Sequence, residues 1–335
     1  MKPSWRSVIG IILSAALIYW TLRGVSAADV WRELSHANWY LLTGSAICAT
    51  LIFPLRARRW RPILDPVSPD LPFAPLWRST AIGMMVNNVV PARAGEVARA
   101  YALTRETGVP FATTLASLAV DRLLDSLVLL GFLGVATFDP VLRRGVASVG
   151  GPLVGVATGG VFILLVMILG VFSLVFFPSV LIRLFELFAR RISPALEAKG
   201  KIVIEKFIAG LSVLRRPDRF AAIFGWTTAH WLLNAIGYTL AFRAFGITVP
   251  FTAALFLLGF IALGAAVPSA PGFFGVFEYM AIQGLAIYGV PKDQATSWAI
   301  GFHIVSFIPI TIIGGYYFTR LGVGFSEFQK GAEGG

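Results

Sequence analysis

Charge is scarce in this sequence. Only 13% of its 335 residues are Asp, Glu, Lys or Arg, whereas 57% are hydrophobic and the mean hydropathy is +0.78. A soluble domain has roughly 25% charged residues, which it needs to cover a water-facing surface. The composition therefore excludes a soluble globular domain and predicts an all-α polytopic membrane protein, because helices satisfy their own backbone groups in lipid.

Cysteine and histidine are also scarce. Cys48 is the single cysteine and lies in an apolar run, so the sequence excludes an internal disulfide and a cysteine-based zinc site. The three histidines, His36, His230 and His303, lie too far apart for a local metal-binding motif. We therefore expect no metal and no cofactor.

Basic residues outnumber acidic ones. The formal net charge is +11 and the isoelectric point is about 10.2, which in a soluble protein would favour nucleic-acid binding. Here the arginines form clusters between apolar runs, which is the pattern of membrane topology signals. We expect cytoplasmic loops that attract anionic lipids, and no nucleic-acid partner.

The apolar runs predict one transmembrane domain over residues 1–335. A full span needs around 20 apolar residues. Two interrupted regions, 74–103 and 251–289, are predicted to be re-entrant helical hairpins. The first run also resembles a signal peptide, but Arg23 precedes the cleavage site and favours an uncleaved span. The six predicted full spans cover residues 7–22, 39–55, 112–138, 153–177, 221–245 and 294–318.

The basic clusters predict the orientation. Lys and Arg gather near the N-terminus, at 56–61 (RARRWR), over 183–219, and at 320–330. If the hairpins do not cross, all four clusters lie on one side, so both termini are cytoplasmic in the cell (inner) membrane. Arg143 and Arg144 then lie outside, as an exception. Segment 180–213 is too charged to span and is predicted to be an amphipathic cytoplasmic interfacial helix.

The chain contains an internal echo. Val-Pro at 90–91 and 267–268 precedes a glycine and then Glu96 or Glu278; Gly-Val-Pro follows at 108–110 and 289–291. Twelve residues after that proline come Arg122 and His303. The order predicts an inverted repeat with halves at about 5–140 and 150–320, an architecture of alternating-access transporters. Chance similarity between apolar sequences is the alternative.

The first hairpin contains polar groups that hydrocarbon does not tolerate unpaired. A helix that restarts after its proline exposes free N–H groups that attract anions. Two interpretations stay open: a bound phosphate headgroup, with Glu96 three residues from either arginine, or a structural ion-pair network. The candidate residues are Asn87, Asn88, Arg93, Glu96 and Arg99, with the helix-break residues Pro91 and Gly95.

A second group lies in the run VDRLLD. Asp121 is about ten residues, or ~15 Å, into a helix that starts near residue 111, which is close to mid-membrane. Asp121 and Asp125 share a helix face, and Arg122 can reach Asp125. A proton or cation relay, a partner for the hairpin arginines, and a structural pairing are the three hypotheses.

The second hairpin is broken by prolines and glycines before Glu278, which has no basic neighbour in sequence. His303 or an arginine of the first half is its expected partner, and a desolvated glutamate without one is a candidate proton carrier. The helix-break residues are Pro268, Pro271, Gly272 and Gly275.

The cluster RARRWR includes Arg56, Arg59 and Trp60. One interpretation is a topology anchor after the second span. The other is a headgroup-gathering patch at the cytoplasmic mouth.

These motifs resemble the flippase-like family that shares the membrane region of lysylphosphatidylglycerol synthases. The matching pieces are Arg59-Trp60, NNVVPARAGEVARAY, VDRLLD and PSAPGFFGVFE, over roughly residues 5–320. The resemblance implies a protein that moves lipids or lipid-linked sugars between leaflets, as members do with aminoacylated phosphatidylglycerol or prenyl-linked glycans. Because the sequence ends at Gly335 without an aminoacyl-transferring domain, we do not expect synthase activity.

The prediction is a transporter for phospholipids or (poly)prenyl-phosphate-linked lipids. Membrane lipids with a phosphate are its expected partners. A lipid-headgroup-modifying enzyme and a non-transporting scaffold are the alternatives. The enzyme is disfavoured because no nucleophile, base and orienting group can be assembled from the motifs.

Overall fold

The computed structural model describes residues 27–90, 94–149, 177–193, 216–264 and 270–322, with scattered positions in 12–19 and 162–173 and at 200. This part of the chain is helical and has no strand, as the composition predicts. Most of the predicted spans over 7–22 and 153–177, and most of 194–213, lie outside the described residues. So do Pro91, Arg93 and Pro268.

The described helices follow the predicted apolar runs. Four predicted spans correspond to α3, α6, α11 and α14, and each interrupted region forms two short helices. Helices α2 and α7 were not expected, and α9 begins close to the predicted interfacial segment. The elements are α2 (Ala27–His36), α3 (Trp39–Leu64), α4 (Phe73–Val89), α5 (Gly95–Thr107), α6 (Phe111–Ala136), α7 (Pro140–Val149), α9 (Pro178–Ile192), α11 (Pro217–Ala244), α12 (Phe251–Gly264), the 3₁₀ turn η2 (Pro271–Phe273), α13 (Val276–Ile287) and α14 (Lys292–Leu321).

The two Gly-Val-Pro motifs make the same turn. Gly108 and Gly289 both have φ of 75°, a left-handed conformation that glycine adopts without a steric penalty. Pro110 and Pro291 then precede α6 and α14 in an extended conformation. Each motif therefore ends the second helix of a hairpin and starts the long helix that follows it.

Helices α3 and α11 form the centre of the bundle, where they pack along each other. Small residues let their backbones approach. Ser45 Oγ donates a hydrogen bond of 2.7 Å to the carbonyl oxygen of Gly237, and a Cβ on Gly237 would lie 3.2 Å from Cβ of Cys48. Close contact through small residues is typical of helix pairs in membranes.

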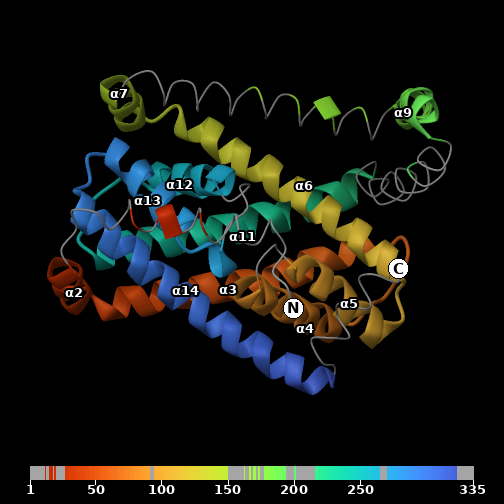
Figure 1. The fold of residues 1–335 in the computed structure, drawn as a ribbon, viewed down its shortest axis with the longest axis horizontal. Coiled ribbons are helices and arrows are strands. Elements are labelled where there is room, and N and C mark those ends of the chain that lie inside the picture. Colours follow the sequence, from red (N-terminus) through yellow and green to blue (C-terminus); the bar gives the residue numbers. More distant parts are fainter. Residues whose placement is uncertain are drawn as a thin grey trace.

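The hairpins lie on opposite sides of this centre. The α4–α5 hairpin packs against α14, and the α12–α13 hairpin packs against α6. Figure 1 shows α4 and α5 toward one end of the bundle and α12 and α13 toward the other.

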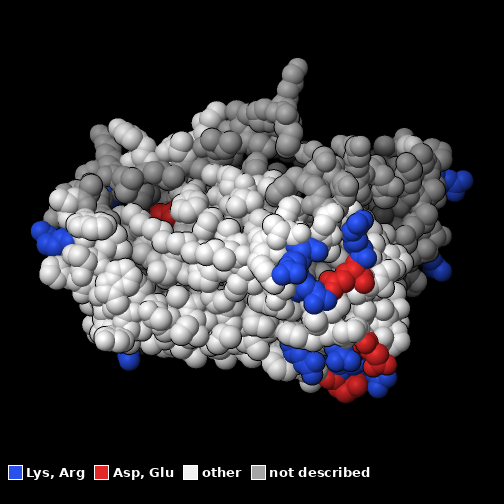
Figure 2. Space-filling view, turned by 90° about the horizontal axis from the view of Figure 1, so that it is seen from below, with Lys and Arg blue, Asp and Glu red and all other residues white. Residues whose placement is uncertain are grey.

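The surface is largely apolar. Along α14, Ile304, Ile308, Ile312 and Tyr316 are exposed at intervals of four residues and form one stripe. Helices α3 and α14 are long and apolar enough to cross a membrane. Most charged side chains on the face drawn in Figure 2 gather toward one end, and the rest of that face is mainly uncharged. Such continuous exposed apolar surface is suited to lipid rather than water.

Candidate functional site

Arg59 lies at the centre of a buried charge cluster. Its side chain is fully buried, its Nη1 lies 2.5 Å from Oδ1 of Asp125, and its Nη2 forms an ion pair with Asp121. Thr227 Oγ1 accepts a further hydrogen bond of 3.2 Å from Nη1. A buried guanidinium needs such partners, because taking it out of water costs several kcal/mol.

This position corrects the sequence interpretation of RARRWR. The predicted second span ends at residue 55, but α3 continues to Leu64. Arg56, Arg59 and Trp60 share the buried face of α3, so they do not form an exposed patch that gathers headgroups. The physical reason is helical spacing together with two carboxylates on α6, which stabilise the arginines inside.

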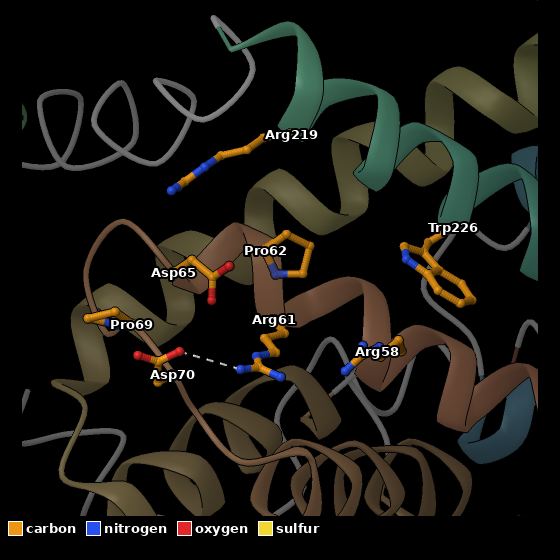
Figure 3. A pocket seen from close by; sticks show the side chains of 8 residues that line it. All are labelled: Arg58, Arg61, Pro62, Asp65, Pro69, Asp70, Arg219 and Trp226. Carbon is orange, nitrogen blue, oxygen red and sulfur yellow. Dashed lines mark ion pairs between the residues drawn. The ribbon is translucent and has the colours of Figure 1, made fainter.

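The other arginines of the RARRWR segment face outward. Arg58 and Arg61 line a surface pocket of about 440 Å³ with Arg219 and Trp226 of α11. Figure 3 shows Arg61 directed toward Asp70, at 3.7 Å, and Arg58 on the α3 side of the same pocket. The side chains of RARRWR that reach this surface are therefore Arg58 and Arg61, not Arg56 and Arg59.

Helix α6 supplies the carboxylates. Asp121 and Asp125 are both buried, one turn apart, on the face that meets α3 and α5. Arg99 Nη1 lies 3.3 Å from Asp121 Oδ2, and Arg56 Nη2 lies 3.7 and 3.6 Å from Asp121 and Asp125. The expected pairing of Asp121 with an arginine of the hairpin is thus observed.

Trp60 positions Arg99. The guanidinium carbon of Arg99 lies 4.0 Å above the indole ring, a cation–π contact, and Trp60 Nε1 donates a hydrogen bond of 2.8 Å to Ser117 Oγ. The indole is therefore fixed between α3, α5 and α6 and holds the arginine against α6.

Glu96 forms an ion pair that the sequence did not suggest. Its Oε1 lies 3.0 Å from Nη2 of Arg122, while Arg93, one of its two expected neighbours, lies outside the described residues. Arg99 is drawn away by Asp121 and Trp60. Arg122 also lies 3.6 Å from Asp125, as the spacing of three residues predicts.

The cluster has more cationic donors than its carboxylates occupy. Among the described residues, four guanidiniums (residues 56, 59, 99 and 122) face three carboxylates (residues 96, 121 and 125), which leaves a formal charge of +1. Five buried guanidinium nitrogens have neither a hydrogen bond nor an ion pair within this part of the chain: Nε of Arg56, Arg59, Arg99 and Arg122, and Nη2 of Arg99. Glu96 Oε2 is the one carboxylate oxygen of these three groups in the same condition. Donors that exceed their acceptors in a buried site favour an anionic ligand.

Helix α11 contributes residues that were missed in the sequence. Trp231 Nε1 donates a hydrogen bond of 2.8 Å to Asp125 Oδ1, and His230 Nε2 lies 3.6 Å from the same atom. With Thr227, these side chains recur at intervals of three and four, so they share one face of the helix. That spacing was the available signal, but only the fold shows that the face meets Asp125.

Hydrogen bonds hold the first hairpin together at the break between α4 and α5. Asn87 Oδ1 accepts a hydrogen bond of 2.8 Å from the backbone N–H of Gly95, the first residue of α5. Asn88 Nδ2 donates to Thr311 Oγ1 of α14 at 2.7 Å. A Cβ on Gly95 would collide with Gly83 and Asn87, so the close approach expected of this glycine is observed.

The second hairpin contains a separate polar pair. Glu278 Oε1 lies 2.6 Å from His303 Nδ1, so histidine is the partner expected among the alternatives. Gly272 and Gly275, with φ of 65° and 86°, and Pro271 form the irregular turn before α13. Within the described residues, no hydrogen bond or ion pair joins Glu278 or His303 to the arginine cluster.

Metal binding finds no support in the described part of the chain. No group of three or more His, Cys, Asp or Glu side chains there is arranged to hold a metal ion.

Comparisons with known proteins agree with the motifs. The family described as "Lysylphosphatidylglycerol synthase TM region" matches residues 7–314. The chain is 25% identical over 332 residues to Glycosyltransferase AglD of Haloferax volcanii, which covers 92% of this chain and 53% of that protein. Two UPF0104 membrane proteins of Methanothermobacter thermautotrophicus are 25% and 24% identical, over 94% and 95% of this chain and 93% of each relative. The chain thus spans about half of the glycosyltransferase and most of each UPF0104 protein.

Proposed function

The chain belongs to the family of lysylphosphatidylglycerol synthase transmembrane regions, and from this membership we propose that it is a lipid flippase. It moves a phospholipid or a prenyl-phosphate-linked lipid between the leaflets of the cell membrane. The observation that carries this proposal is the buried cluster around Arg59, with its surplus of guanidinium donors. A lipid phosphate is an anion that reaches such a site while its tails stay in the bilayer.

Arginine is the side chain best suited to this ligand. Its planar fork binds two phosphate oxygens at once and keeps its charge at any physiological pH. Arg99 has both Nε and Nη2, on one edge of its guanidinium, without a hydrogen-bond partner among the described residues. We propose that this edge binds the phosphate, while Asp121 holds the other edge.

The packing of the helices supports an inverted repeat. The contact of α4 with α14 has its counterpart in α12 with α6, α3 with α4 in α11 with α12, and α5 with α6 in α13 with α14. The echoed residues also form equivalent pairs, Glu96 with Arg122 and Glu278 with His303. Two such halves give alternating access when they exchange conformations.

The ends of the hairpins support re-entry from opposite sides. The start of α4 and the end of α5 line one pocket with the end of α14, through Arg78, Arg105 and Arg320. The start of α12 meets the end of α6, where Thr252 donates a hydrogen bond to Asp139. We propose that the first, arginine-rich end is cytoplasmic and that both termini lie there.

The pocket in Figure 3 is our candidate for gathering headgroups. Arg58 and Arg219 have no partner among the described residues, and Trp226 is a residue type that favours the membrane–water interface. This pocket replaces Arg56, Arg59 and Trp60 as the proposed headgroup-gathering patch.

The test is translocation in liposomes that contain the purified protein. Fluorescent phosphatidylglycerol, phosphatidylcholine and prenyl phosphate are compared, and a membrane-impermeant quencher reports which leaflet each occupies. We expect Arg99→Gln to slow movement of the phosphate lipid by about 10–100-fold, the worth of ~1.5–3 kcal/mol for a hydrogen bond to a charged group. Arg105→Gln on the exposed face of α5 is the matched control.

The outcomes separate the candidate functions. Movement of a phosphate lipid that folded Arg99→Gln loses supports the flippase. A chemically altered lipid recovered from the same liposomes supports a headgroup-modifying enzyme, which the name of the Haloferax relative suggests. If folded protein neither moves a lipid nor forms a product, the outcome supports a scaffold without transport activity.

The orientation has its own test. In a Cys48→Ala background, we expect a cysteine at exposed position Asp70 to react with an impermeant maleimide from the cytoplasm, and one at Thr137 from outside. Labelling of both from one side contradicts the proposed topology.

A further inference from the structure

We propose that Glu278 and His303 form a proton-binding site that couples lipid movement to the proton gradient. The inference deepens the proposed function, because it assigns an energy source to the same transport cycle. It rests on the geometry of the pair, on its surroundings, and on its counterpart in the first half of the chain.

The pair is buried and held on every polar atom. Glu278 and His303 are 6% and 7% exposed. His303 Nε2 lies 2.8 Å from the carbonyl oxygen of Gly272, and Nδ1 lies 2.6 Å from Glu278 Oε1. Glu278 Oε2 accepts a hydrogen bond of 2.6 Å from the N–H of Gly275.

These contacts determine the number of protons. A carbonyl oxygen only accepts, so Nε2 of His303 must have a hydrogen. The contact between Nδ1 and Oε1 needs one more, which is either on the imidazole or on the carboxyl group. Both forms are neutral as a pair, so the site holds one exchangeable proton. Its loss leaves a buried negative charge and two acceptors facing each other, which is unfavourable.

The surroundings tolerate both forms with the proton bound. The ring of Phe274 stacks on the imidazole at 4.3 Å, and Phe277 lies at 4.6 Å. Aromatic faces stabilise an imidazolium, and the apolar environment favours a pair without net charge.

No other ionisable group of the described chain pairs with these two side chains. Helix α12 and η2 contain none. The other elements packed against α13 and α14 have ionisable groups with contacts of their own. On α4, Arg78 pairs with Glu106, and on α3 the arginines of the central cluster pair with the carboxylates of α6. On α11, His230 lies beside Asp125 and Tyr238 against Phe302, and on α7 Arg143 and Arg144 bond to backbone oxygens. Arg243 on α11 and Arg32, Glu33 and His36 on α2 lie elsewhere.

The equivalent pair in the first half of the chain suggests why a proton-binding pair in the second half is useful for transport. Glu96 and Arg122 occupy the echoed positions and lie 3.0 Å apart, but arginine never releases its proton. The first half thus has, at this position, a guanidinium that keeps its charge beside the proposed phosphate site. The second hairpin has a copy whose charge can change.

A transport cycle follows from this difference. With the proton bound, the pair ties α13 to α14 and to the turn at Gly272. When the pair becomes open to water on one side, the proton leaves to water and the glutamate and histidine separate. The hairpin then shifts, and a proton from water on the other side restores the pair. One proton crosses per cycle, with no other reactant.

Infrared difference spectroscopy of the reconstituted protein tests proton binding directly. We expect a change of bath pH to produce, in the wild type, a carboxyl and an imidazole difference band that are missing from the difference spectra of Glu278→Gln and His303→Gln. Asp293→Asn, which removes an exposed carboxylate of α14, is the control and should retain the change. A wild-type spectrum identical to that of Glu278→Gln at every pH overturns the proton site.

Transport in liposomes tests coupling. A gradient of one pH unit should shift the distribution of the lipid between leaflets by up to about tenfold for one coupled proton. In Glu278→Gln, whose amide can keep both hydrogen bonds, we expect lipid exchange that ignores the gradient. If Glu278→Gln does not fold, His303→Gln replaces it as the test of coupling.

The two proposals fail separately. If the wild type moves lipid at equal rates with and without a gradient, or if folded Glu278→Gln keeps its response, coupling is wrong and the flippase stands. If no lipid moves under any gradient, the flippase is wrong, and the infrared bands still decide whether the pair binds a proton.

Discussion

Replacing Arg59 with methionine separates a buried ion cluster from a surface topology signal. Arg58 and Arg59 are neighbours on α3, yet Arg58 is exposed without a described partner, whereas Arg59 is fully buried between Asp121 and Asp125. Methionine has a similar length and no charge. Arg58→Met is therefore a control that matches helix, chemistry and size.

The structure sets the expected magnitude. Arg59→Met leaves two buried carboxylates whose remaining arginine contacts are 3.3 Å or longer. Removing one partner of a buried ion pair costs about 3–5 kcal/mol, whereas an exposed substitution stays within about 0.5 kcal/mol. Because 1.4 kcal/mol is tenfold in an equilibrium constant, the unfolded population should rise by about two to four powers of ten.

The assay is equilibrium unfolding of the detergent-solubilised protein, followed by circular dichroism. Adding Asp125→Leu to Arg59→Met should cost less than the sum of the two single changes, because the second change removes a charge that the first left unpaired. Equal stability of Arg58→Met and Arg59→Met would refute the argument, since it would mean that the cluster contributes no more than a surface charge.

Two further predictions concern the hairpin and the missed residues of α11, and the same unfolding assay checks both. Gly95→Ala should destabilise the protein by about 1–3 kcal/mol, because the added Cβ collides with Gly83. Gly131→Ala, which has open space around it, should be neutral or stabilising. Equal effects of the two substitutions would contradict the close approach. Trp231→Phe should lower the free energy of unfolding by about 1.5–3 kcal/mol, because it removes a hydrogen-bond donor to a charged carboxylate. Trp226→Phe, on the surface pocket, should lower it less. The reverse order would show that the indole contact with α6 is not important.

Much of the fold was predictable from local patterns. The helix that begins at Phe111 was expected near residue 111, and the interrupted region at 74–103 predicted the hairpin of α4 and α5. Gly-Val-Pro served in the sequence only as a sign of an internal repeat, and the structure shows that both copies form equivalent turns. The end of α3 was not predictable in this way, because four arginines in six residues resemble a loop until their partners are known.

The sequence by itself determined that the chain is helical, apolar, broken at two glycine- and proline-rich sites and similar to its membrane family. These properties depend on composition and on residues close along the chain. Only the tertiary structure decided that Arg56 and Arg59 face inward, that Glu96 pairs with Arg122, and that Trp231 reaches Asp125. The physical reason is that a charge remains in an apolar interior only where a partner meets it, and here the partners lie 26 to 106 residues away.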